Sequence, residues 1–176
     1  MVKQSGSAVA KAAAAEVQQY LTFQLGGEMY AVGILNVREI IEYGQLTEIP
    51  MMPAFIRGVI NLRGAVVPVI DLAVRFGSHG TEIGRRTCIV IIEMQVGDAR
   101  QELGIIVDAV SEVIEISPAE IEPAPSFGAR IRADFIAGMG KIDGKFVIIL
   151  DIARVLSVDE MASLAAVSGR SEEEPA

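Results

Sequence analysis

The sequence predicts an all-β chain that folds as two small, similar β-barrels packed together, followed by a C-terminal helix. One observation behind this prediction is a series of short apolar runs separated by Gly-containing turn signals, which is typical of hairpins. The other is an internal repeat that gives both halves of the 176-residue chain one plan. A sheet of few short strands hides its edges best by closing on itself, so each half is expected to form a barrel.

The folded part is predicted to begin near Tyr20. Apolar and polar residues alternate over 21–25, which is the period-two pattern of a half-buried strand, and a second run follows over 28–32. The Gly26-Gly27 pair between them predicts a tight hairpin turn, because glycine tolerates the positive φ angles that such turns require.

A second hairpin is predicted from the runs 58–62 and 65–70, joined at Arg63-Gly64. Pro68 has no N–H to donate to a neighbouring strand, so its strand is expected to lie at an edge or to carry a bulge. Asp71 is placed to cap a short helical turn with its carboxylate.

The later elements carry the same kinds of signal. A polar connector is expected over 78–86, and Ser117 with Glu120 forms a capping box around Pro118 that marks a helical turn. A second capping box, Ser157 with Glu160, opens the predicted C-terminal helix. Further strands are predicted at 88–92, 103–107 and 146–150.

The internal repeat appears when residues 54–76 are moved 80 positions onto residues 134–156. Seven of the 23 positions are then identical, and Gly58, Gly64 and Asp71 fall on Gly138, Gly144 and Asp151. An offset of 73 places Val37, Glu39, Ile41 and Glu42 on Val110, Glu112, Ile114 and Glu115. The two aspartates are expected to be two copies of one structural cap.

This repeat leads to a division of the chain into consecutive parts. The first barrel is expected over about 20–80, the second over about 87–156 and the helix over about 158–167. Residues 1–19 are expected to be a flexible tail, and 168–176 a disordered acidic tail.

Composition excludes several classes of function. The formal net charge is −8, which disfavours binding to nucleic acid and to anionic membrane surfaces. A nucleic-acid-binding β-barrel is nevertheless the second class of function to consider, because small β-barrels often have that role. One Cys and one His allow neither an internal disulfide nor a Cys- or His-rich metal site. His79 lies in the polar connector without a second His as partner, so no catalytic constellation is visible. The chain is therefore expected to be a non-enzymatic adaptor without cofactor or metal, with a groove at the seam between its barrels.

Four segments resemble the CheW family of bacterial chemotaxis coupling proteins. They are the runs 20–26, 34–40, 53–64 and 67–72, and the block from Phe55 to Gly64 is the most specific of them. Segments 104–108 and 121–125 fit as well, and the resemblance covers about 20–167. It implies two five-stranded SH3-like β-barrels. It also implies a cytoplasmic scaffold, recruited to receptor arrays at the inner membrane, that links the cytoplasmic tip of methyl-accepting chemoreceptors to the regulatory domain of the histidine kinase CheA.

The same resemblance implies a set of site residues. The receptor groove is expected to include Val37, Glu39, Gly58, Arg63, Cys88 and Ile89. For Val37 and Ile89 the alternative is ordinary barrel core, and for Gly58 it is a close approach of two backbones. Arg63 is expected either to contact the receptor or to form an ion pair with a carboxylate.

The kinase-binding residues are expected to be Phe127 and Glu122, on either side of the Pro123-Ala124-Pro125 segment. Phe127 resembles an apolar anchor, which a semi-rigid Pro-rich segment would hold in place. Glu122 stands where many relatives have a basic residue, so this contact is expected to be altered or to be matched by a change in the partner.

Overall fold

The computed structural model describes residues 17–44, 46–96, 98–124 and 133–156. The expected C-terminal helix over 158–167, the acidic tail over 168–176 and Phe127 lie outside the described residues. Of the tail expected over 1–19, residues 1–16 also lie outside the described residues. Its last two residues belong to the first strand, which begins at Gln18.

The described residues confirm an all-β fold made of two sheets. The six-stranded sheet has the order β8 (Ala109–Ile116), β1 (Gln18–Leu25), β2 (Glu28–Gly33), β11 (Lys145–Leu150), β10 (Ile136–Ile142) and β9 (Ile121–Glu122). The five-stranded sheet has the order β3 (Val37–Glu42), β6 (Cys88–Val96), β7 (Ala99–Val107), β5 (Ala65–Asp71) and β4 (Ile56–Leu62). Short helical turns connect them: η1 (Ile34–Asn36), α2 (Leu72–Arg75), η2 (Pro118–Glu120), η3 (Ala133–Phe135) and α3 (Ile152–Val155).

Three hairpin turns have the backbone conformation that their sequences predict. Gly26 and Gly27 join β1 to β2 with φ angles of 58° and 84°. Arg63-Gly64 joins β4 to β5, and Asp143-Gly144 joins β10 to β11; the first residue of each has a φ angle of 52°. The two copies of the repeat therefore turn in the same way, since positive φ at both central residues suits a two-residue hairpin.

The caps are also confirmed, whereas the expectation for Pro68 is wrong. The Asp71 side chain accepts from the backbone N–H of Ala73 at the start of α2, and Asp151 plays the same part at α3. Pro68 lies in β5, which is not an edge strand, because β5 has β4 on one side and β7 on the other. Nor does β5 bulge at Pro68, since the register of this pair shifts on β4, between Ile56 and Gly58. Its missing N–H is tolerated because the parallel pairing with β7 begins one residue later, at Val69.

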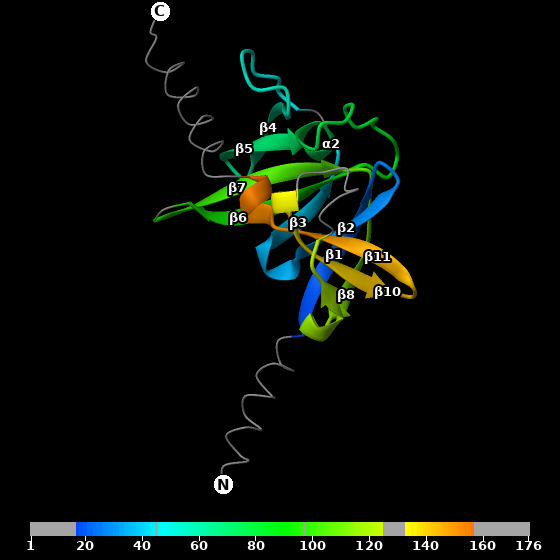
Figure 1. The fold of residues 1–176 in the computed structure, drawn as a ribbon. Coiled ribbons are helices and arrows are strands. Elements are labelled where there is room, and N and C mark those ends of the chain that lie inside the picture. Colours follow the sequence, from blue (N-terminus) through cyan, green and yellow to red (C-terminus); the bar gives the residue numbers. More distant parts are fainter. Residues whose placement is uncertain (1–16, 45, 97, 125–132, 157–176) are drawn as a thin grey trace, which may run out of the picture.

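The strand pairing divides the chain differently from the expected barrels over 20–80 and 87–156. The five-stranded sheet takes all its strands from 37–107, and the six-stranded sheet combines the N-terminal hairpin β1–β2 with strands from 109–150. In Figure 1 the blue β1 and β2 accordingly lie beside the orange β11, far away in sequence.

The repeat itself is confirmed, with its first hairpin exchanged between the halves. The edge strands β3 and β8 correspond, as do the hairpins β4–β5 and β10–β11. Hairpin β6–β7 completes the first copy, and β1–β2 completes the second, by equivalent antiparallel and parallel pairings. Two copies of one plan offer two nearly equivalent partners to each hairpin, so the local pattern could not show which pairing occurs.

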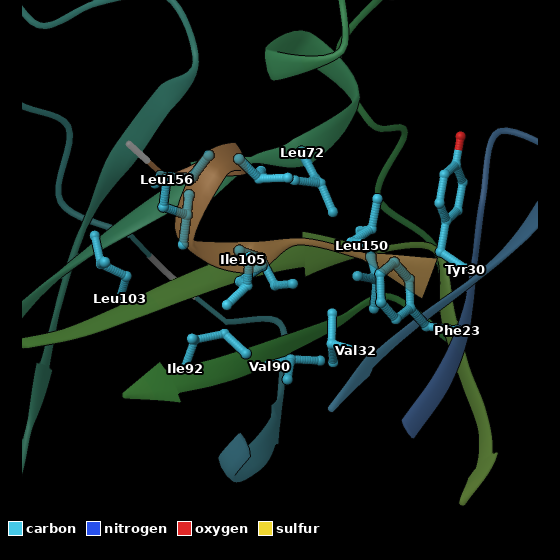
Figure 2. Close-up of a cluster of buried hydrophobic side chains, with 14 of the residues drawn as sticks. Phe23, Tyr30, Val32, Leu72, Val90, Ile92, Leu103, Ile105, Leu150 and Leu156 are labelled. Carbon is cyan, nitrogen blue, oxygen red and sulfur yellow. The ribbon is translucent and has the colours of Figure 1, made fainter. Parts of the chain in front are cut away.

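The two sheets face each other across a central apolar cluster (Figure 2). Phe23, Tyr30 and Val32 reach it from the six-stranded sheet, and Val90 and Ile105 reach it from the five-stranded sheet. Each sheet also buries a smaller cluster on its other face: one around Ile116 and Ile149, and one around Ile89 and Ile91. The central cluster takes side chains from both sheets and therefore packs them together, whereas each smaller cluster belongs to one sheet.

Neither sheet is a closed ring of strands in the described residues, so the barrels are open. Each sheet nevertheless curls, because the chain that leaves one edge strand returns to pair with the other edge. After β3, Thr47 pairs with Val59 of β4 through two backbone hydrogen bonds of 2.9 Å. After β8, β9 pairs with β10, where Glu122 lies opposite Met139, the repeat equivalent of Val59.

Candidate functional site

The six expected receptor-binding residues all lie on the five-stranded sheet or at its turn. Val37 and Glu39 are on the edge strand β3, and Cys88 and Ile89 are on its neighbour β6. Gly58 is on β4, and Arg63 is at the β4–β5 turn. The set is therefore gathered around edge strand β3 and the facing end of the β4–β5 hairpin.

These residues do not share one face of the sheet. Val37 and Cys88 are partly buried and pack against the central cluster between the sheets. Glu39 lies opposite Ile91, on the face that holds the smaller cluster, and Ile89 belongs to that cluster. Ile89 is fully buried, with 0% of its surface exposed, so its place is that of barrel core.

Glu39 and Arg63 form an ion pair that joins β3 to the β4–β5 turn. The Arg63 side chain donates to Glu39 Oε1, and this bond holds the pKa of the Glu39 carboxyl below its usual value. In the same way Glu39 raises the pKa of Arg63. Of the two alternatives for Arg63, the structure contains the ion pair, which helps to hold together the two edges of the curled sheet.

Gly58 lies where two backbones approach closely. A Cβ added there would come within 2.6 Å of the Thr47 carbonyl oxygen, a distance that real side chains do not adopt. At the repeat position Gly138, a Cβ would lie 2.4 Å from Ile121 and 3.2 Å from the Glu122 carbonyl oxygen. Both glycines thus allow the returning chain to pair with β4 or β10, which is a structural reason for their presence.

Two exposed apolar residues next to Val37 were missed at the level of sequence. Leu35 in η1 is 92% exposed, and Ile40 in β3 is 42% exposed. We call Leu35, Val37 and Ile40 the β3 margin. One signal was available: apolar residues at 37, 40 and 41 break strict alternation, and the structure has a bulge between Val37 and Glu39.

Of the expected kinase-binding residues, the structure places Glu122 alone, since Phe127 lies outside the described part. Glu122 is exposed on the short strand β9, at the edge of the six-stranded sheet. Its repeat equivalent is Thr47, which pairs with the corresponding position of β4.

Among the residues that the structure describes, the most buried charged side chain is that of Asp71, and its role is structural. Asp71 is 1% exposed and accepts from Arg57 Nη1 at 2.5 Å, from the Thr81 backbone N–H at 3.0 Å and from the Thr81 hydroxyl at 2.9 Å. These bonds tie β4, α2 and the polar connector together and satisfy the carboxylate. The sequence indicated the cap at Asp71 but not its partner Arg57.

The described residues contain no group of three or more His, Cys, Asp and Glu side chains placed to hold a metal ion. Cys88 is partly buried, and its thiol donates to the Arg86 carbonyl oxygen at 3.3 Å. Within the same residues, every helix is too short or too polar to cross a bilayer.

Comparison with known proteins adds family relationships to this geometry. A family model described as a CheW-like domain matches residues 19–160. A chemotaxis protein CheW of Klebsiella aerogenes is 39% identical over 145 residues, covering 82% of this chain and 85% of its own length. A Myxococcus xanthus relative, protein FrzA, is 32% identical over 152 residues, covering 84% of this chain and 91% of its own. Among solved structures, the scaffolding protein TtCheW from Thermoanaerobacter tengcongensis superposes with a TM-score of 0.73 at 38% identity, covering 82% of this chain and 90% of that one.

Proposed function

This chain belongs to the CheW family, and we propose that it is a non-enzymatic adaptor that couples transmembrane chemoreceptors to the histidine kinase CheA. The names of its relatives support this proposal, since they are called chemotaxis proteins and, in the solved structure, a scaffolding protein. On this proposal the chain works in the cytoplasm and is recruited to receptor arrays at the inner membrane.

The observation that carries the receptor half of the proposal is the β3 margin. Leu35 and Ile40 expose apolar surface beside the partly buried Val37, on an edge strand next to the central cluster. An amphipathic helix docks by placing its apolar face against such a surface. The cytoplasmic tip of a chemoreceptor would supply that helix.

The other expected receptor residues then act mainly by shaping this margin. Arg63 fixes β3 to the β4–β5 turn through Glu39, and Gly58 lets the chain after β3 return to β4. Ile89 packs beneath β3, where it lies opposite Ile41, and offers no surface of its own. Cys88, the first residue of β6, lies opposite Glu42 at the end of β3 and is partly buried.

For the kinase half, we propose a contact at β9 that includes Glu122 and, following it in the chain, Phe127. The exposed carboxylate of Glu122 at a sheet edge favours a basic residue on the regulatory domain of CheA. The Pro123-Ala124-Pro125 segment would limit the freedom of Phe127 and lower the entropy lost on binding.

The proposal is tested by sedimentation of membranes that carry the organism's own chemoreceptor, mixed with purified chain and CheA. The chain is expected to sediment with the receptor and to raise the amount of bound CheA. Val37→Asp is expected to weaken receptor binding by at least about tenfold, because it places an unpaired charge on the apolar margin. Because Val37 also packs partly against the central cluster, the melting temperature of this variant is expected to fall by no more than that of a matched variant at the equivalent position of the repeat.

Val110→Asp is the matched control, because Val110 is the repeat equivalent of Val37 and is also partly buried against the central cluster. It is expected to keep receptor binding. Equal loss of binding in both variants would point to damage of the central cluster, and full binding of Val37→Asp would contradict the assignment of the margin.

A further inference from the structure

A cleft of about 540 Å³ opens on the six-stranded sheet between β8, the β1–β2 hairpin and the β10–β11 turn. Apolar side chains of Met29, Ile114 and Phe146 line part of it, and Phe146 is 50% exposed. Thr22, which is buried, lies in its wall and exchanges hydrogen bonds with the backbone of Glu112 at 2.8 and 3.1 Å. None of the proposed receptor- or kinase-binding residues lines this cleft.

The repeat relates this cleft to a filled position in the five-stranded sheet. Edge strands β3 and β8 pair with their neighbours in the same register, and both pairings shift at the same place. This register equates Glu39 with Glu112, and the hairpin offset of 80 residues equates Arg63 with Asp143.

In the five-stranded sheet, two arginines occupy this place. Arg63 pairs with Glu39 across the gap between the sheet edges. Arg38, the bulge residue of β3, forms two ion pairs: its Nε lies 3.3 Å from Glu102 Oε2, and its Nη1 lies 3.6 Å from Glu93 Oε2.

In the six-stranded sheet, both cations are replaced. Asp143 stands at the position of Arg63 and Ser111 at the position of Arg38, and none of the described residues that line the cleft is an arginine. Glu112 and Asp143 carry like charges and cannot pair. With Glu28 they make three acidic residues in the lining, against one basic residue, Lys145. The cleft therefore combines an apolar wall with an excess of negative charge.

We propose that this cleft binds a segment of a partner protein that presents an arginine flanked by apolar residues. The guanidinium takes the place that Arg63 has in the five-stranded sheet and pairs with Glu112 and Asp143, while the apolar neighbours cover Phe146 and Met29. Arginine is favoured because its planar fork binds carboxylates in two-point contacts and is more weakly hydrated than a lysine ammonium.

The probe is the peptide acetyl-Gly-Leu-Arg-Leu-Gly-amide, with glutamine in place of arginine as the control peptide. Both are titrated into the full-length, 15N-labelled chain, and amide shifts of Gly27, Ser111 and Asp143 are followed by NMR. The arginine peptide is expected to give saturable shifts at these residues and to bind at least about fivefold more tightly than the control, a modest gain for an exposed ion pair. No shifts at the cleft, or equal binding of the two peptides, would overturn the proposal.

Asp143→Arg closes the cleft from within. Asp143 and Arg63 share a φ angle of 52°, so the backbone already accepts arginine in this conformation, and the new side chain can reach Glu112 as Arg63 reaches Glu39. Peptide binding is expected to disappear while the melting temperature stays the same or rises.

Glu112→Gln is the near-isosteric second variant, because it removes one charge without filling the cleft. It is expected to weaken the arginine peptide by about fivefold and to leave the glutamine peptide unchanged. Binding of the arginine peptide at unchanged affinity to either variant would overturn the proposal, and it would leave the adaptor function untouched, because the two use different residues.

Discussion

Removing the Arg57 side chain tests how the first copy of the repeat is held together. Arg57→Ala takes the cation from Asp71, a carboxylate that is 1% exposed, and leaves it with hydrogen bonds from the Ala73 and Thr81 backbones and the Thr81 hydroxyl. Removing one partner of a fully buried ion pair lowers the free energy of unfolding by about 3–5 kcal/mol. The Arg57 side chain is itself 34% exposed, so water weakens the pair. We therefore expect a loss of about 2 kcal/mol.

The loss is measured by urea unfolding followed by far-UV circular dichroism, since the sequence has no Trp to serve as a fluorescent probe. Arg85→Ala, at an exposed arginine of the polar connector, controls for the loss of one positive charge. A loss for Arg57→Ala within about 0.5 kcal/mol, the range of ordinary surface substitutions, would refute the reasoning that this carboxylate depends on its cation.

Two further predictions concern the expected receptor residues. Gly58→Ala should destabilise the chain by about 1–3 kcal/mol in the same urea assay, because the new Cβ meets the backbone oxygen of Thr47 and the paired chain must move; an unchanged midpoint would remove the structural reason for this glycine. Arg63→Ala should destabilise the chain at neutral pH and not at acid pH. Glu39 has a lowered pKa in the folded chain, so its stabilising share is present above the ordinary glutamate value of about 4.3 and is lost as pH falls through the lowered value. A difference between unchanged chain and variant that is the same at pH 7 and pH 3 would contradict that role.

Much of the local structure could be predicted because its causes lie within a few residues. The turn at Gly26-Gly27, the cap at Asp71 and the capping box from Ser117 to Glu120 depend on backbone φ angles and on hydrogen bonds to near neighbours. The expectation for Pro68 failed because it depended on which strand lies beside β5 and at which residue that pairing begins.

The candidate site was predicted in part for the same reason. The resemblance gathered its residues on β3, β4 and β6, which are neighbours or facing edges in the folded chain. It could not separate the exposed β3 margin from the buried Ile89, since exposure depends on what covers each face. Leu35 and Ile40 were missed because an apolar residue is normally expected to be buried, and nothing in the neighbouring sequence indicates that it is exposed.

The sequence by itself determined most of the strands, the turns and the presence of two copies of one plan, since alternation, turn residues and repeat identities can be recognised in the sequence alone. The edge strands β3, β8 and β9 were not among the predicted runs. Only the tertiary structure decided that hairpin β1–β2 completes the second copy and β6–β7 the first, because each hairpin had two similar partners and packing at the central cluster selects between them. It also decided what equivalent positions do: Arg63 pairs with Glu39, whereas Asp143 and Glu112 line an open cleft. The two charged positions of each pair, 39 with 63 and 112 with 143, are more than 20 residues apart in the chain, so only folding brings them to one place.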